Sequence, residues 1–180
     1  MFYLPGTALW PHDKDVVRIA FKFEWTKGND MTDDWLGKEI DQKQEARTER
    51  RSELLLAGWA ERGAPRLFRD VSDCVRHDVE RYQAELGDKS IEFNFRPSRS
   101  FSVRRSHYPA AELMVELHDV TIEYQHSFTP NDVASPQVTR GYFRIEADAT
   151  GNVQAKHDGS ALVPAQISAV LLKPVFDALG

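Results

Sequence analysis

Near Lys89 the hydrophobic period of this chain changes from helical spacing to strand spacing. Before that point apolar residues recur every three or four positions, as in Leu67, Val71, Val75 and Val79, which is the period of one helix face. After it, apolar and polar residues alternate, which is typical of strands with one buried face. Helices and strands are therefore segregated along the chain, and we predict an α+β fold. Its parts are an N-terminal αα-hairpin, an antiparallel β-sheet built from successive hairpins, and a C-terminal apolar helix packed on the sheet.

Length and composition favour one domain. The chain has 180 residues, of which 41% are hydrophobic, and a domain of that size can bury a core. We predict a single α+β domain over 31–180, divided into a helical hairpin (31–88), a sheet (89–158) and a C-terminal helix (159–180). Residues 1–30 are predicted to be an N-terminal extension.

Two interpretations of this extension stay open. Apolar and polar residues alternate from Val17 to Trp25, which favours an extra strand. The alternative is an over-extended gene start, with Met31 as the true start.

The helical hairpin is predicted from composition and from two stop signals. Residues 32–62 are rich in Glu, Lys, Arg, Gln and Ala, which favour helix. Gly63 suits the left-handed position after a last helical turn, and Pro65 either prevents continuation or opens the next helix. A second helix then carries the apolar face described above and ends at Gly87.

Three hairpins are predicted by matching apolar residues across their turns. The key pairs are Phe95 with Phe101, Leu117 with Val120 around a His118-Asp119 turn, and Ala147 with Val153. Between the second and third hairpins we expect a loop over Ser127–Thr139, either a functional loop or a surface connection. The last helix is expected to be capped by Asp158 or Ser160, and Pro174 to kink or break it.

Composition and charge narrow the classes of partner. No apolar run reaches the ~18 residues of a membrane span, and the N-terminus has no signal-peptide pattern. Cys74 is the one cysteine, so no internal disulfide forms and a cytoplasmic location is expected. The net charge is −5 without a basic stripe, which disfavours nucleic acid and anionic membranes as partners.

No motif in the sequence specifies a reaction. Phosphate-binding glycine loops, HExxH, paired CxxC and GxSxG are all absent. Negative charge near Cys74 disfavours a reactive thiolate. The acidic neighbours of this cysteine are Asp70, Asp73 and Asp78. A metal site that used His126 and Glu112 would need a third ligand that the sequence does not indicate. We therefore assign no catalytic residue, no cofactor and no metal, and favour a non-catalytic role while leaving enzymatic activity open.

The densest basic group lies in the first predicted hairpin. Glu92 is expected to lie opposite Arg104 and to neutralise it in part. Arg96 and Arg99, at the turn, stay free to bind phosphate or nucleic acid weakly.

The most specific signal is the order of charges in the first predicted helix. Along Asp41–Glu53 eight of 13 residues are charged. The acidic stripe recurs every four positions: Asp41, Glu45, Glu49 and Glu53. The basic stripe is two positions out of phase: Lys43, Arg47 and Arg51. An offset of two residues is about 200° around a helix, so the two stripes lie on roughly opposite sides.

The second predicted helix instead pairs opposite charges at i,i+4. The expected pairs are Arg69–Asp73, Arg76–Glu80 and Arg81–Glu85. Sorted charges on the first helix favour a protein–protein interaction or self-association module that meets a protein partner, or the same helix of a second copy in antiparallel array. The alternative is a small-molecule-binding domain or enzyme, with a pocket between sheet and helices near 127–139.

Overall fold

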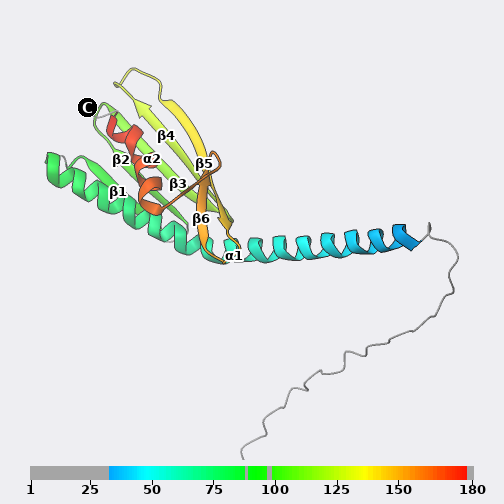
Figure 1. The fold of residues 1–180 in the computed structure, drawn as a ribbon. Coiled ribbons are helices and arrows are strands. Elements are labelled where there is room, and N and C mark those ends of the chain that lie inside the picture. The colour runs from blue at the N-terminus through cyan, green and yellow to red at the C-terminus, as the bar shows by residue number, and fades with distance from the viewer. Residues whose placement is uncertain (1–32, 88, 97–98, 178–180) are drawn as a thin grey trace, which may run out of the picture. The chain divides into compact units, whose positions relative to one another are not determined.

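The computed structural model describes residues 33–87, 89–96 and 99–177, and Figure 1 shows their arrangement. The chain divides into two units, Met1–Asp41 and Gln42–Gly180. In the first unit the described residues form the beginning of one helix. The predicted strand from Val17 to Trp25 lies outside the described residues, as does Met31.

The second unit is an antiparallel sheet with helical segments on one face, so the predicted α+β class is confirmed. The helices are α1 (Asp33–Leu86), which begins in the first unit, and α2 (Pro164–Asp177). The strands are β1 (Ile91–Arg96), β2 (Ser100–Arg105), β3 (Ala110–His118), β4 (Thr121–Thr129), β5 (Gln137–Ala147), β6 (Val153–His157) and β7 (Ser160–Leu162). They lie in the sheet in sequence order, each antiparallel to the next, as predicted for successive hairpins.

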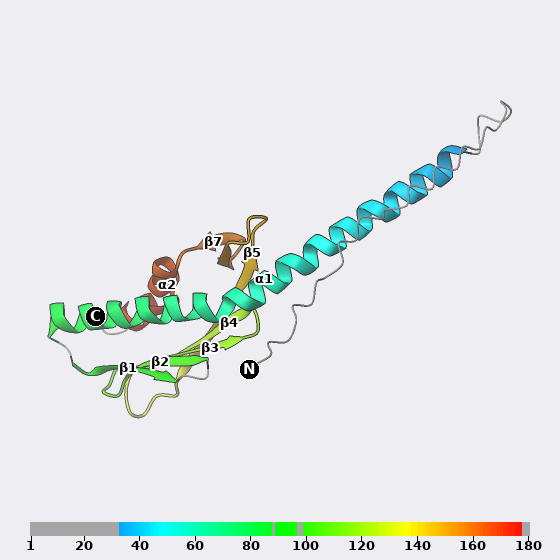
Figure 2. The same cartoon turned by 90° about the horizontal axis from the view of Figure 1, so that it is seen from below.

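The hydrophobic core lies between one face of the sheet and two helical segments. Figure 2 shows α2 and the later half of α1 on the same side of the strands. Phe68 of α1 packs on Phe101 of β2, with ring centroids 5.4 Å apart. Ile167 and Leu171 of α2 are fully buried. A C-terminal helix packed on the sheet is therefore confirmed.

The predicted αα-hairpin is wrong, because a single helix, α1, runs through both stop signals. Gly63 sits inside the helix with the Val153 side chain packed against its backbone, where any Cβ would overlap it. The missing side chain therefore permits a close approach rather than a helix end. Pro65 lacks the N–H that would bind the Glu61 carbonyl, a cost of about 3 kcal/mol. Ala64, before this proline, and Phe68, after it, are both buried against the same face of the sheet, and their burial offsets that cost.

The first and third predicted hairpins have the predicted registers. Phe95 lies opposite Phe101, and Ala147 opposite Val153. In the second hairpin the register is shifted, because Leu117 pairs with Ile122 rather than with Val120. Asp119 has φ 50° at the turn, and Asp tolerates the left-handed conformation better than most residues. The turn therefore centres one residue later, and the two-residue change in pairing keeps the same side chains on the core face.

The predicted loop Ser127–Thr139 is too long, since β4 and β5 continue into it. Ser127 pairs with Val138 and Phe128 with Gln137, so the connection covers only 130–136. Hydrogen bonds from backbone N–H groups to the Asn131 side chain close this connection. The loop was predicted too long because strands with polar residues on their outer face have a composition similar to that of loops.

The C-terminal helix, predicted over 159–180, begins later than expected. Residues 160–162 form β7, and α2 begins at Pro164, a residue favoured in the first helical turn. The expected caps at Asp158 and Ser160 are wrong, because Val163 is the N-cap and donates its N–H to Gln166 Oε1 over 3.0 Å. Pro174 does not end the helix, which continues to Asp177.

Candidate functional site

The predicted partner-binding residues all lie on α1 and are all exposed. These residues are Asp41, Lys43, Glu45, Arg47, Glu49, Arg51 and Glu53. Leu54 and Leu55 follow them with exposed fractions of 68% and 51%, high values for leucine. The segment 42–55 of the second unit therefore carries both charge and uncovered apolar surface.

The acidic stripe lies on the side of α1 that becomes the buried side farther along. Counting back from buried Ala60 by intervals of four and three reaches Leu56, Glu53 and Glu49, which share one helix face. The basic stripe follows the opposite side. Leu54 lies three residues after Arg51 and so extends the basic side.

Arg96 and Arg99 are both exposed, on either side of positions 97–98, which lie outside the described residues. The Arg99 carbonyl accepts a hydrogen bond from Leu117 N–H at 2.8 Å, and this residue has φ 91°. A hollow of about 60 Å³ beside Arg96 also contains the carboxylates of Glu112 and Glu116. It has the volume of only one or two waters, and its carboxylates oppose an anion. Anion binding at Arg96 and Arg99 stays a prediction.

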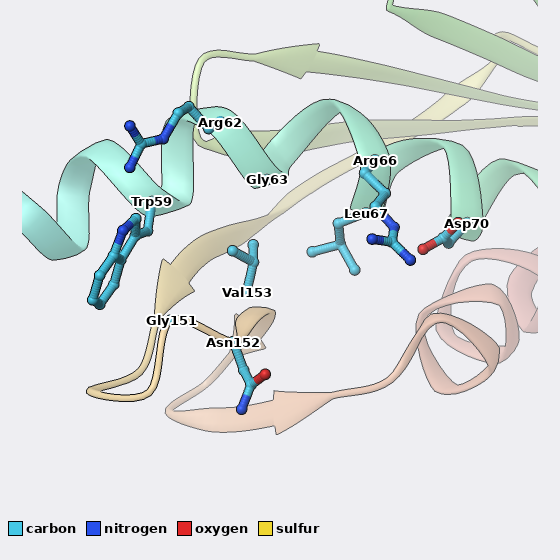
Figure 3. A pocket seen from close by; sticks show the side chains of 9 residues that line it. All are labelled: Trp59, Arg62, Gly63, Arg66, Leu67, Asp70, Gly151, Asn152 and Val153. Atoms are coloured by element: carbon cyan, nitrogen blue, oxygen red, sulfur yellow. The ribbon is translucent and has the colours of Figure 1, made fainter.

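A larger groove, of about 560 Å³, lies between α1 and the β5–β6 turn, as Figure 3 shows. Trp59, Arg62, Arg66 and Asp70 line it from one side of the helix, and Asn152 and its neighbours line it from the turn. Among the described residues, neither Arg62 nor Arg66 has an ion pair or a side-chain hydrogen bond. The groove therefore has two arginines without a carboxylate partner.

The wall opposite the helix is a turn closed by the side chain of Asp148. Its Oδ1 accepts hydrogen bonds from Thr150 N–H at 2.9 Å, Thr150 Oγ1 at 2.6 Å and Asn152 N–H at 3.0 Å. The bond from the Thr150 hydroxyl is the largest cause that lowers the pKa of Asp148. Gly151, with φ 85°, brings the turn backbone against the Trp59 ring. A tightly bonded turn thus holds one wall of the groove in place.

The groove is not predicted from the sequence, because the stop signals at Gly63 and Pro65 place Arg62 and Arg66 on different helices. On one continuous helix they are one turn apart, and Arg62 has no carboxylate at i±3 or i±4. The absence of a carboxylate partner for Arg62 could have been recognised in the sequence. Downstream, Arg81 binds Glu85 at 2.7 Å as predicted, whereas Arg76 binds Asp73 at 2.9 Å rather than the predicted Glu80. The predicted Arg69–Asp73 ion pair is absent from the described residues.

The surroundings of Cys74 and His126 favour structural roles for both residues. Burial is the largest cause that raises the pKa of the Cys74 thiol, followed by the charges of Asp78, Asp70 and Asp73. The thiol therefore stays protonated near neutral pH. His126 Nε2 lies 2.7 Å from the Leu171 carbonyl oxygen, which can only accept, so Nε2 carries the proton. In the part of the chain that the structure describes, no three His, Cys, Asp or Glu side chains are grouped to hold a metal ion.

Comparison with known proteins gives no relative. No family model matches the chain, no curated protein matches it, and no solved structure matches it. Among the described helices, none combines the length and apolarity that a membrane crossing requires.

Proposed function

We propose that this protein is a non-catalytic interaction module that binds a protein partner through residues 42–55 of α1. The observation that carries the proposal is the joint exposure of sorted charges and of Leu54 and Leu55. Exposed charge alone is ordinary for a helix. Two adjacent leucines, by contrast, are at least half exposed to water. A partner that covered them would gain about 1.5–3 kcal/mol for each side chain fully buried.

The chemistry of the partner follows from the side that carries Leu54. On that side of α1 the helical turns before Leu54 carry Lys43, Arg47 and Arg51. The complementary surface of a partner would therefore be acidic, with an apolar patch at the end that meets Leu54. The charges would speed association and select the partner, while the leucines would supply most of the affinity.

Self-association through the same segment is less favoured by charge. An antiparallel two-fold pair centred on Arg47 sets Arg47 against itself and Lys43 against Arg51 of the second copy. Pairing through the acidic side sets carboxylates against carboxylates in the same way. Like charges opposite one another destabilise an interface, so the proposed partner is a different protein.

A photo-crosslinking experiment tests the proposal. A photoreactive residue replaces Leu54 in the full chain, expressed in its own cells, and the crosslinked protein is identified and purified. The matched control places the same residue at Arg144 on the outer sheet face, which is also exposed. We expect a protein with an acidic surface to crosslink only from position 54.

Affinity measurements on charge variants complete the test. K43E/R47E/R51E should weaken binding of the purified partner by tenfold or more, about 1.4 kcal/mol, while E45K/E49K/E53K should leave it unchanged or strengthen it. Equal losses in both variants, or crosslinks only to a second copy of this chain, would overturn the proposal.

A further inference from the structure

The groove between α1 and the β5–β6 turn contains two arginines that form no ion pair with the described residues. Arg62 and Arg66 are exposed and one helical turn apart, and neither has a hydrogen-bonded or ion-paired partner among the described residues. Two like charges at i,i+4 repel one another, so their proximity opposes helix stability. A dianion between them would convert this repulsion into attraction.

The two side chains leave the helix in different directions. Figure 3 shows Arg62 extending away from the β5–β6 turn, above Trp59, and Arg66 directed toward Asp70. No ion pair joins Arg66 to Asp70. Because exposed arginine side chains change rotamer readily, both guanidinium groups can reach one anion placed between them.

The neighbours of the arginines define the rest of the ligand. Trp59 is partly exposed and packs on the turn at Gly151, so a rigid aromatic surface stands one turn before Arg62. Asp70 stands one turn beyond Arg66, where its carboxylate opposes an anion placed next to it and can accept a hydrogen bond from a hydroxyl or amino group. The groove volume of about 560 Å³ is within the range of small-molecule sites.

We propose that this groove binds a small organic phosphate that also has a planar ring. The phosphate lies between the Arg62 and Arg66 guanidinium groups, which match its oxygens two at a time. The ring contacts the Trp59 indole. The turn held by Asp148 keeps the opposite wall in place, so only the arginine side chains need to be ordered on binding. This site is separate from the surface at 42–55 and does not depend on the proposed function.

Calorimetric titration of the full chain with three probes tests the proposal. The probes are adenosine monophosphate, inorganic phosphate and adenosine, at low ionic strength. We expect the nucleotide to bind more tightly than phosphate alone, and adenosine to bind more weakly than either. Equal binding of phosphate and nucleotide would overturn the role of the ring. Binding of adenosine as tight as the nucleotide would overturn the role of the arginines.

Variants matched in charge separate a built site from general attraction. R62Q/R66Q removes both groove arginines and should lower nucleotide affinity about tenfold or more. R50Q/R69Q removes the same charge from exposed positions of α1 outside the groove and should change affinity less than twofold. Circular dichroism melting verifies that both variants are folded.

An optical readout places the ligand at Trp59. In a variant with Phe in place of Trp10, Trp25 and Trp35, indole fluorescence arises from Trp59 alone. We expect saturable quenching by the nucleotide at the concentrations at which heat is released. Heat without quenching, equal loss in both arginine variants, or no saturable heat would overturn the proposal.

Discussion

At the scale of single residues, two glycines of α1 have opposite roles. A Cβ on Gly63 would overlap the Val153 side chain, whereas a Cβ on Gly58 would meet nothing within 4 Å. Glycine lowers helix stability by roughly 0.5–1 kcal/mol relative to alanine. This penalty brings no packing gain at Gly58, but at Gly63 it allows α1 to approach β6.

We therefore expect alanine substitution to have opposite signs at the two glycines. Gly58→Ala should stabilise the protein by about 0.5–1 kcal/mol, and Gly63→Ala should destabilise it by about 1–2 kcal/mol through overpacking. Chemical denaturation measures both changes. Adding Val153→Ala to Gly63→Ala should recover part of the loss. Changes of the same sign in both single variants would contradict this packing.

The pH dependence of stability is expected to reflect Asp148. Its pKa is lowered in the folded protein, chiefly by the Thr150 hydroxyl, so folding favours the ionised form. The stabilisation is complete above the unfolded pKa, about 4 for aspartate, and is lost as pH falls through the lower folded value. Denaturation at pH 6 and pH 3 should therefore show a smaller acid-induced loss in Asp148→Asn than in the native chain. Equal losses would show that the turn does not favour the charged form.

At the scale of elements, two contacts join α1 to α2. Tyr82 stacks on Phe176 with ring centroids 4.1 Å apart, and the buried Ser168 hydroxyl donates to Asp78 Oδ2 at 2.6 Å. A hydrogen bond from a buried donor to a charged acceptor contributes more than an exposed one. These contacts fix where the short α2 lies along the much longer α1.

Ser168→Ala is expected to destabilise the protein by about 1–3 kcal/mol, because Asp78 loses its buried donor. The matched control is Ser52→Ala, also in a helix, whose hydroxyl donates to the Thr48 carbonyl on the exposed surface. Alanine there should change the unfolding free energy by less than about 0.5 kcal/mol. If thermal or denaturant unfolding gave equal effects, the Ser168–Asp78 bond would not join the helices as described.

The sequence predicts a hairpin register correctly where the apolar patterns of two strands must match each other. It does not predict the structure at a residue that is compatible with two different local structures. Phe95 and Phe101 define a register because only one pairing puts both apolar patterns on one face of the sheet. Gly63 can end a helix or admit a neighbouring side chain, and its neighbour, Val153, is 90 residues away in sequence. The groove was missed for the same reason, since it forms only when α1 is continuous and packs beside the β5–β6 turn.

At the scale of the whole molecule, the distribution of charge bears on whether two copies of the chain would associate. The net charge of −5 is small for 180 residues, so general repulsion alone does not keep copies apart. The stripes on α1 provide a local repulsion, because each side presents one sign to a two-fold copy of itself. Specificity of this kind arises from unfavourable alternative pairings as much as from favourable ones.

The purified chain is therefore expected to be monomeric. Sedimentation velocity at micromolar concentrations should give the mass of one 20.6 kDa chain at both low and moderate salt. K43L/R47L/R51L should associate, because it replaces like charges with apolar residues next to Leu54. A native dimer that dissociates with salt would instead support self-association through the stripes.

The sequential order of the strands also has a consequence for how the chain is made. Each strand pairs with the strand that follows it in sequence, so the sheet can grow one hairpin at a time with short loop closures. During synthesis, however, α1 leaves the ribosome before any of the strands β1–β7 exists to cover Val71, Val75 and Val79. The helix that organises the finished core is thus the segment that stays uncovered longest in the newborn chain, until the first hairpins form beneath it.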